Sequence, residues 1–154
     1  MMLELHNVRI GQLVSDLSLT VGDGQMLCLT GASGTGKTTL LRAVMGFIPI
    51  DGGHISIDGE LLTPQSAPYF RRMTAYVPQR LSLPDGYTDI VADYCWLLKK
   101  AVQSGKPLLI VDEPQQLLSE DEAEEVDRLL GEAVQHGTTV LAVNDRITEN
   151  RVSL

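Results

Sequence analysis

The sequence has little of what disulfide-rich or membrane-embedded proteins depend on. It contains two cysteines, Cys28 and Cys95, too few for a disulfide framework, which fits a reducing compartment with the cytoplasm as the default. No apolar run approaches the roughly 20 residues that a membrane span requires, and the first residues lack the basic-then-apolar layout of a signal peptide. We therefore expect no direct insertion into a membrane.

Positive charge is also scarce. The chain has 12 Lys and Arg against 20 Asp and Glu, which gives a formal net charge of −8. This balance argues against a broad surface for nucleic acid or for an anionic membrane. It does not exclude a nucleotide, because a small phosphate ligand needs only a local positive site. At 154 residues the chain is expected to form one compact domain with its own hydrophobic core.

Short apolar segments alternate with turn residues along the whole chain. We expect strands at 3–8, 17–21, 26–30, 54–57, 73–77, 107–114, 138–143 and 151–154. Helical spacing predicts helices at 37–46, at 89–103 and after the capping-box pattern of Ser119 and Glu122. The continuous apolar runs near 107–114 and 138–143 are typical of strands buried on both faces. Alternation of strands and helices predicts an α/β fold with a largely parallel central sheet.

A glycine-rich stretch joins the strand at 26–30 to the helix that follows. Gly31, Gly36, Lys37 and Thr38 satisfy G-x-x-x-x-G-K-[ST] between a strand and a helix, which is the context that this motif requires. Without β-carbons, the loop can turn its N–H groups around a phosphate, and the helix N-terminus adds a positive dipole end. Lys37 can then reach the β- and γ-phosphates, and the Thr38 hydroxyl can bind Mg²⁺. We interpret the loop as a triphosphate site, with a glycine-rich turn that binds nothing as the alternative.

Two adjacent acids end the apolar run "LLIVDEP". An acid at the end of a buried strand can hold the shell of Mg²⁺, which assigns Asp112 to the metal. Glu113 would then be placed to polarise an attacking water as a general base. The alternative is a strand that simply ends in two solvated acids.

These motifs together resemble the nucleotide-binding domain of ATP-binding-cassette (ABC) proteins. "GASGTGKTT" looks like that family's Walker A motif, "RRMTAYVPQ" like its Q-loop, "PLLIVDEP" like its Walker B strand, and "HGTTVLAVND" like the strand that enters its switch loop. The resemblance implies a three-layer P-loop NTPase fold over 1–154, with a largely parallel central sheet and a small N-terminal antiparallel β part. It implies phosphate binding by Gly31, Ser33, Gly34, Thr35, Gly36, Lys37, Thr38 and Thr39, Mg²⁺ binding by Thr38, Gln79 and Asp112, and catalytic roles for Lys37, Gln79, Glu113 and Asn144.

The sequence also departs from the family pattern. Gln79 and Asp112 are 33 positions apart, so the family's helical subdomain is expected to be shortened between 80 and 106, and the signature "LSGGQ" is missing. Asn144 stands where the family has a histidine; it can hydrogen-bond a phosphate oxygen or a water but carries no positive charge. The chain also lacks the aromatic residue that usually stacks on adenine. We therefore expect ATP binding with weak base preference and slow hydrolysis.

Other conspicuous side chains receive structural interpretations. Cys28 lies inside a predicted strand and is expected in the core. The three histidines are scattered, and their spacing does not indicate a metal site. Tyr94 and Trp96, on the predicted helix at 89–103, are expected to cover the core, with a partner surface as the alternative.

Two functions follow from these motifs. The first is the nucleotide-binding subunit of an ABC-type transport system, which uses ATP and Mg²⁺ and works with a membrane permease subunit or a second nucleotide-binding subunit at the inner face of the membrane. The second is a degenerate ATP-binding module that regulates a partner with little turnover. A small-molecule or nucleoside kinase is a third hypothesis, although we find no arginine-rich lid segment.

Overall fold

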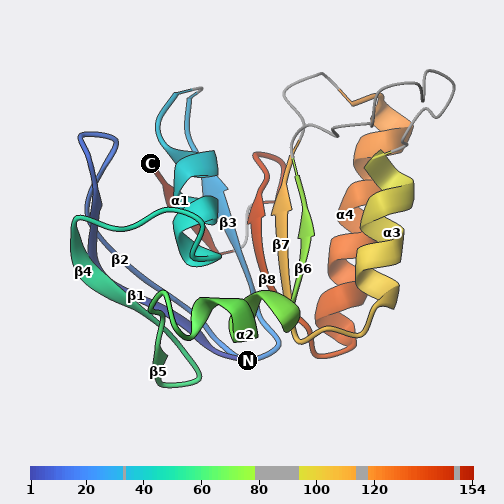
Figure 1. Ribbon diagram of the computed structural model, residues 1–154. Helices are drawn as coiled ribbons and strands as arrows, with labels where there is room; N and C mark the ends of the chain where they lie inside the picture. The colour runs from blue at the N-terminus through green and yellow to red at the C-terminus, as the bar shows by residue number, and fades with distance from the viewer. Residues whose placement is uncertain (33, 79–93, 114–117, 148–149) are drawn as a thin grey trace, which may run out of the picture.

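The described residues of the chain form two β-sheets and four helices (Figure 1). The computed structural model describes residues 1–32, 34–78, 94–113, 118–147 and 150–154. An antiparallel sheet has the strand order β2-β1-β4-β5 and consists of β1 (Leu3–Ile10), β2 (Val14–Val21), β4 (Gly52–Ile57) and β5 (Glu60–Leu61). A parallel sheet has the order β6-β7-β8-β3-β9 and consists of β3 (Met26–Thr30), β6 (Thr74–Val77), β7 (Leu108–Asp112), β8 (Thr139–Val143) and β9 (Arg151–Ser153). The helices are α1 (Lys37–Val44), α2 (Ala67–Arg72), α3 (Tyr94–Gln103) and α4 (Glu120–Gln135).

The parallel sheet is buried on both faces, as the apolar runs predicted. On β7, Leu108 and Ile110 pack into a core shared with α1 and the antiparallel sheet, whereas Leu109 and Val111 pack into a core shared with α3 and α4. Successive strand residues point to opposite faces, so one strand serves both cores. Figure 1 shows α3 and α4 side by side beyond β6 and β7, with α1 toward the antiparallel sheet. The predicted three-layer arrangement and the N-terminal antiparallel part are thereby confirmed.

The register of the parallel strands brings three chain segments to one edge of the sheet. Leu29 of β3 pairs with Val143 of β8, and Asp112 of β7 pairs with Val143 from the other side. The loop after β3, the acids at the end of β7 and the turn after β8 therefore leave the sheet together. Ligands bind at the carboxyl ends of strands in open α/β sheets, so a ligand site is expected at this edge.

Some elements differ from the sequence-based expectation. β2 begins at Val14, three residues before the predicted start at 17. The left-handed backbone of Asp16 (φ 52°) and the register shifts in the pairing with β1 interrupt the alternation of apolar and polar residues there. β5 and α2 were not predicted, since two and six residues are too few to show a period. Of the helix predicted at 89–103, residues 94–103 are helical and 89–93 lie outside the described residues.

The aromatic residues of α3 face different surroundings. Tyr94 is buried, as expected, whereas the prediction for Trp96 is wrong because that side chain is 54% exposed. Residues two positions apart on a helix do not share a face, so both rings cannot enter the same core. Lys100 covers the indole instead, with its ammonium nitrogen 5.5 Å from the ring centroid.

Cys28 is buried, and burial raises the pKa of its thiol to about 11, which fits its predicted place in the core. Among the described helices, none is both long and apolar enough to cross a membrane.

The predicted capping box at the start of α4 is present. The N–H of Glu122 donates to the Ser119 hydroxyl oxygen at 3.1 Å, and the N–H of Ser119 donates to the Glu122 carboxylate at 3.1 Å. We expect Ser119→Ala to lower the free energy of unfolding by about 1 kcal/mol, because one helix-end N–H loses its acceptor. Glu122→Gln keeps an oxygen for the return bond and is expected to change stability less. Thermal unfolding of both variants measures the difference; equal losses would contradict this role of Ser119.

Candidate active site

The glycine loop forms a turn whose conformation depends on its glycines. Gly36 precedes α1 with φ 97°, and a β-carbon there would lie 3.1 Å from the Leu13 β-carbon. Gly31 has φ 141°, and a β-carbon there would lie 3.0 Å from the Thr35 hydroxyl oxygen. Non-glycine residues are strained in these conformations and would also crowd the neighbouring atoms. Space remains open around Gly34, where a β-carbon would meet no described atom within 4 Å.

The start of α1 is available to a ligand. The helix begins at Lys37, and the residue at its N-cap position is Gly36. No side-chain hydrogen bond caps the helix at this end among the described residues. The first N–H groups of a helix have no partner within the helix, and they carry the positive end of its dipole. The Lys37 ammonium group donates a hydrogen bond to the Gly31 carbonyl oxygen, so the side chain lies across the loop. Backbone N–H groups and one ammonium group are thus gathered where a phosphate would bind.

Asp112 lies beside this loop at the end of β7. Its side chain is 1% exposed, and one carboxylate oxygen accepts a hydrogen bond from the Thr38 hydroxyl at 2.7 Å. The other oxygen, Oδ1, is buried with no hydrogen-bond partner among the described residues. Burial raises the pKa of this carboxyl, while the Thr38 hydroxyl and the Lys37 ammonium act in the opposite direction. A buried carboxylate oxygen without a partner is costly unless a cation or proton joins it.

The oxygens of Thr38 and Asp112 fit Mg²⁺. This ion prefers oxygen ligands and is usually held by one or two protein carboxylates together with waters and substrate phosphates. Gln79, the third predicted metal ligand, and Ser33, a predicted phosphate ligand, lie outside the described residues. Across the described parts of the chain, no group of three or more His, Cys, Asp or Glu side chains could hold a metal ion. Of the three predicted metal ligands, Thr38 and Asp112 lie within the described residues, side by side at the glycine loop.

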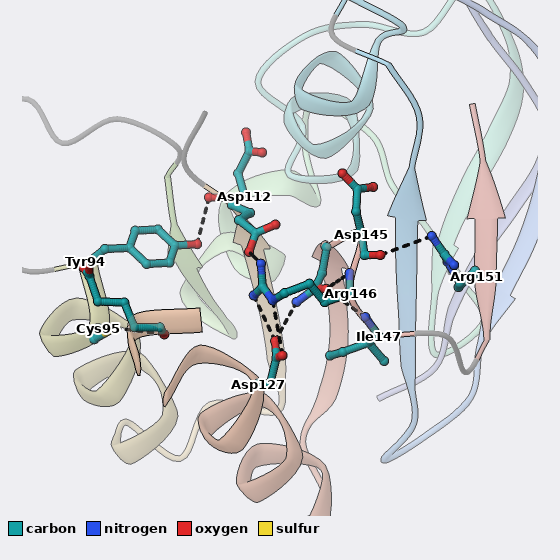
Figure 2. Close-up of polar contacts among 11 residues, drawn as sticks. Tyr94, Cys95, Asp112, Asp127, Asp145, Arg146, Ile147 and Arg151 are labelled. Carbon is teal, nitrogen blue, oxygen red and sulfur yellow. Dashed lines mark hydrogen bonds and ion pairs between the residues drawn. The ribbon is translucent and has the colours of Figure 1, made fainter. Parts of the chain in front are cut away.

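Glu113 follows Asp112 and contacts a residue that the sequence analysis missed. The Arg146 guanidinium donates through Nη1 to Glu113 Oε1. The same guanidinium binds Asp127 of α4, from Nη2 at 2.9 Å and from Nε at 3.2 Å; Figure 2 shows Arg146 and Asp127 facing each other. Burial raises the pKa of Glu113, and its hydrogen bond and ion pair with Arg146 lower it. The predicted general base is thus held in a partly buried ion pair.

Asn144 is buried at the end of β8 and is used within the protein. Its amide nitrogen donates to Asp127 at 3.0 Å, and its amide oxygen accepts from the backbone N–H groups of Arg146 at 2.7 Å and Ile147 at 3.0 Å. These contacts fix the turn that follows β8. The role of Asn144 toward a phosphate stays a prediction.

A second residue that sequence reasoning missed supports the end of β7. The hydroxyl of Tyr94 on α3 donates to the backbone carbonyl oxygen of Asp112 at 2.8 Å (Figure 2). Tyr94 is buried, and burial raises the pKa of its hydroxyl well above the usual range. The bond links α3 directly to the strand end that carries both acids. The aromatic residue was predicted in the core, but a helical period gives no sign of the polar partner.

Comparison with known proteins identifies relatives for most of this chain. A family model described as ABC transporter matches residues 14–132. An uncharacterized ABC transporter ATP-binding protein of Haemophilus influenzae is 40% identical over 83 residues, which are 51% of this chain and 32% of that protein. The Fe(3+) ions import ATP-binding protein FbpC 2 of Pectobacterium atrosepticum is 40% identical over 84 residues, which are 51% of this chain and 24% of that protein. The matched segments therefore span about a quarter to a third of these relatives.

A solved structure has the same fold. It is a dimeric ATP-binding cassette in a post-hydrolysis state, bound to ADP and Pi, with a TM-score of 0.77 and 18% sequence identity. The match covers 99% of this chain and 94% of that chain. The correspondence includes both sheets, so the arrangement of strands around the glycine loop is shared.

Proposed function

This chain belongs to the ABC transporter family, and on that basis we propose that it binds Mg·ATP and hydrolyses it slowly as the nucleotide-binding subunit of an ABC-type transport system. One observation carries the proposal. The buried Asp112 carboxylate, with one oxygen on the Thr38 hydroxyl and the other unpartnered among the described residues, lies beside a loop that gathers helix-end N–H groups and the Lys37 ammonium. An anionic site next to a cationic one suits a metal-bound polyphosphate.

Each of these residues has a defined task in hydrolysis. The loop amides and Lys37 neutralise the phosphate oxygens, and Thr38 and Asp112 would hold Mg²⁺, which supplies further charge neutralisation when bound. Glu113 accepts a proton from a water molecule while the water oxygen attacks the γ-phosphorus. The bond from the γ-phosphorus to the bridging oxygen breaks, which yields ADP and inorganic phosphate. Slow turnover is expected because the chain lacks the "LSGGQ" sequence and has Asn144 in place of a histidine.

A transport system also requires partners. We propose that the chain binds a membrane permease subunit or a second nucleotide-binding subunit, and that it does so in the cytoplasm at the inner face of the membrane. The proposal is supported by the relative described as an import ATP-binding protein and by the dimeric state of the similar cassette.

A nucleotide titration followed by a turnover measurement on the same sample tests the proposed function. Calorimetry with Mg²⁺ present is expected to show heat on addition of ATP and ADP, and inorganic phosphate is expected to appear slowly in the ATP sample. Binding without any phosphate release would favour the regulatory module instead. Transfer of phosphate to an added acceptor would favour a kinase, and no heat with ATP, ADP or GTP would contradict the proposal.

The metal role of Asp112 gives a separate prediction. Asp112→Asn keeps the shape of the side chain but removes its charge, so the Mg²⁺ concentration that gives half-maximal ATP hydrolysis should rise by about tenfold, the equivalent of about 1.4 kcal/mol. Asp121→Asn, which removes an exposed acid at the start of α4, serves as the control and should leave this concentration unchanged. A Mg²⁺ titration of phosphate release measures both. The same half-maximal concentration in Asp112→Asn and the unmodified chain would contradict the assignment.

A further inference from the structure

Arg146 joins three elements of the fold around the predicted general base. Its guanidinium donates to Asp127 of α4 from Nη2 at 2.9 Å and from Nε at 3.2 Å. The third nitrogen, Nη1, donates to Glu113 at the end of β7. Arg146 itself lies in the turn after β8. A guanidinium has a planar, fixed fork, so two bonds to one carboxylate also set the direction of the remaining N–H groups.

The turn that carries Arg146 is itself held in place. The amide oxygen of Asn144 accepts from the backbone N–H of Arg146. The amide nitrogen of Asn144 donates to Asp127 Oδ1, which also accepts from Arg146 Nη2. Asp127 therefore organises both residues from the neighbouring helix. The backbone of Arg146 is held through Asn144 and its side chain is held by Asp127 directly, so both contacts depend on the same carboxylate.

The contact with Glu113 lies in a partly buried place. The side chain of Glu113 is 14% exposed and that of Arg146 is 34% exposed. Charge-assisted hydrogen bonds are stronger and better oriented where water is partly excluded. Among the described residues, the ion pair engages one oxygen of the Glu113 carboxylate and no hydrogen bond engages the second, which can then take a proton from water. Without the cation, the carboxylates of Glu113 and Asp127 would repel each other across this space.

We propose that Arg146 is a positioning residue for ATP hydrolysis, which holds the Glu113 carboxylate in one orientation while Asp127 and Asn144 hold Arg146. The inference rests on the proposed function, since it assigns Glu113 to the attacking water. It gives Asn144 a task in the turn after β8, and it places a positive charge two residues beyond the position where the family has a histidine.

Substitution of Arg146 tests the proposal. Because hydrolysis is slow, phosphate release is measured with protein in excess over radiolabelled Mg·ATP, and ATP affinity is measured by calorimetry. Arg146→Gln is expected to lower the single-turnover rate at saturating protein by about 10- to 100-fold, the effect found for outer-shell partners that orient metal-ligating side chains. ATP affinity should change by less than about threefold, since Arg146 contacts the base and not the glycine loop. Arg146→Lys, which keeps the charge but not the fork, is expected to restore part of the rate.

Two further variants separate positioning from a structural effect. Arg128→Gln removes another arginine with two carboxylate partners, Glu125 and Glu132, on the exposed face of α4, and should leave the rate unchanged. Asp127→Asn weakens the anchor without removing the guanidinium, and is expected to lower the rate less than Arg146→Gln. It also serves as the test if Arg146→Gln fails to fold, which thermal unfolding of every variant reveals.

The combination with Glu113→Gln is the most direct test. If Arg146 acts through Glu113, Arg146→Gln should slow the Glu113→Gln variant no further, although it slows the unmodified chain. An equal loss in both backgrounds would overturn the proposal, as would an unchanged or faster rate in Arg146→Gln alone. A chain that binds ATP but releases no phosphate above the Lys37→Ala background contradicts the proposed hydrolysis itself, and the positioning role is then lost with it.

Discussion

Lys37→Ala is expected to weaken the binding of Mg·ATP by about 100-fold, because a hydrogen bond to a charged group contributes about 1.5–3 kcal/mol and each 1.4 kcal/mol is a factor of ten. The ammonium group of Lys37 is the positive charge that the structure holds across the glycine loop, through its bond to the Gly31 carbonyl oxygen. The helix-end N–H groups remain in the variant, so some affinity for phosphate should persist. Isothermal titration with ATP measures the change.

A matched control exists in Lys106. It also donates to a backbone carbonyl oxygen, that of Thr74 at 3.5 Å, but it precedes β7 at the opposite end from Asp112. Lys106→Ala therefore removes the same charge and a similar bond without touching the glycine loop, and ATP affinity should be unchanged. Equal losses in Lys37→Ala and Lys106→Ala would mean that overall charge, and not a local site, determines affinity. Unchanged affinity in Lys37→Ala would contradict the site.

The backbone part of the site could be predicted from the sequence because it depends on local patterns. The glycine spacing before Lys37 requires a turn that other residues do not adopt, and the apolar run that ends at Asp112 requires a strand buried on both faces. Parallel strands in one sheet place their carboxyl ends at one edge. The contact between Thr38 and Asp112, 74 positions apart, is the consequence of these two patterns.

The side-chain network around Glu113 could not be predicted in the same way. Arg146 follows a strand in a segment with no period, and Asp127 lies on the polar side of an amphipathic helix, where an acid is ordinary. Their meeting depends on how α4 packs against the sheet and on the turn that Asn144 stabilises. The sequence therefore indicates Glu113 as a candidate base, but it gives no sign of the side chains that hold it.

Glu113→Gln has the largest expected effect on turnover. The glutamine keeps the volume of the side chain but cannot accept a proton from water, and loss of a general base costs about 10²- to 10⁴-fold in rate. ATP affinity should stay within about threefold of the unmodified chain, because an interaction that acts only in the transition state contributes little to ground-state binding. Phosphate release at saturating ATP and calorimetry on the same preparation measure the two quantities separately.

A control for Glu113→Gln should also remove a glutamate that pairs with an arginine. Glu132 also pairs with an arginine, Arg128, at 3.1 Å, but on the exposed face of α4, so Glu132→Gln removes a comparable contact away from the glycine loop and should leave turnover unchanged. If Glu113→Gln hydrolyses ATP at the rate of the unmodified chain, Glu113 is not the base, and its ion pair with Arg146 serves only stability. If both bind ATP and neither releases phosphate, the regulatory module is the better description. A loss confined to Glu113→Gln would instead place proton transfer at the carboxylate that Arg146 holds, since each variant removes one carboxylate charge and one contact with an arginine.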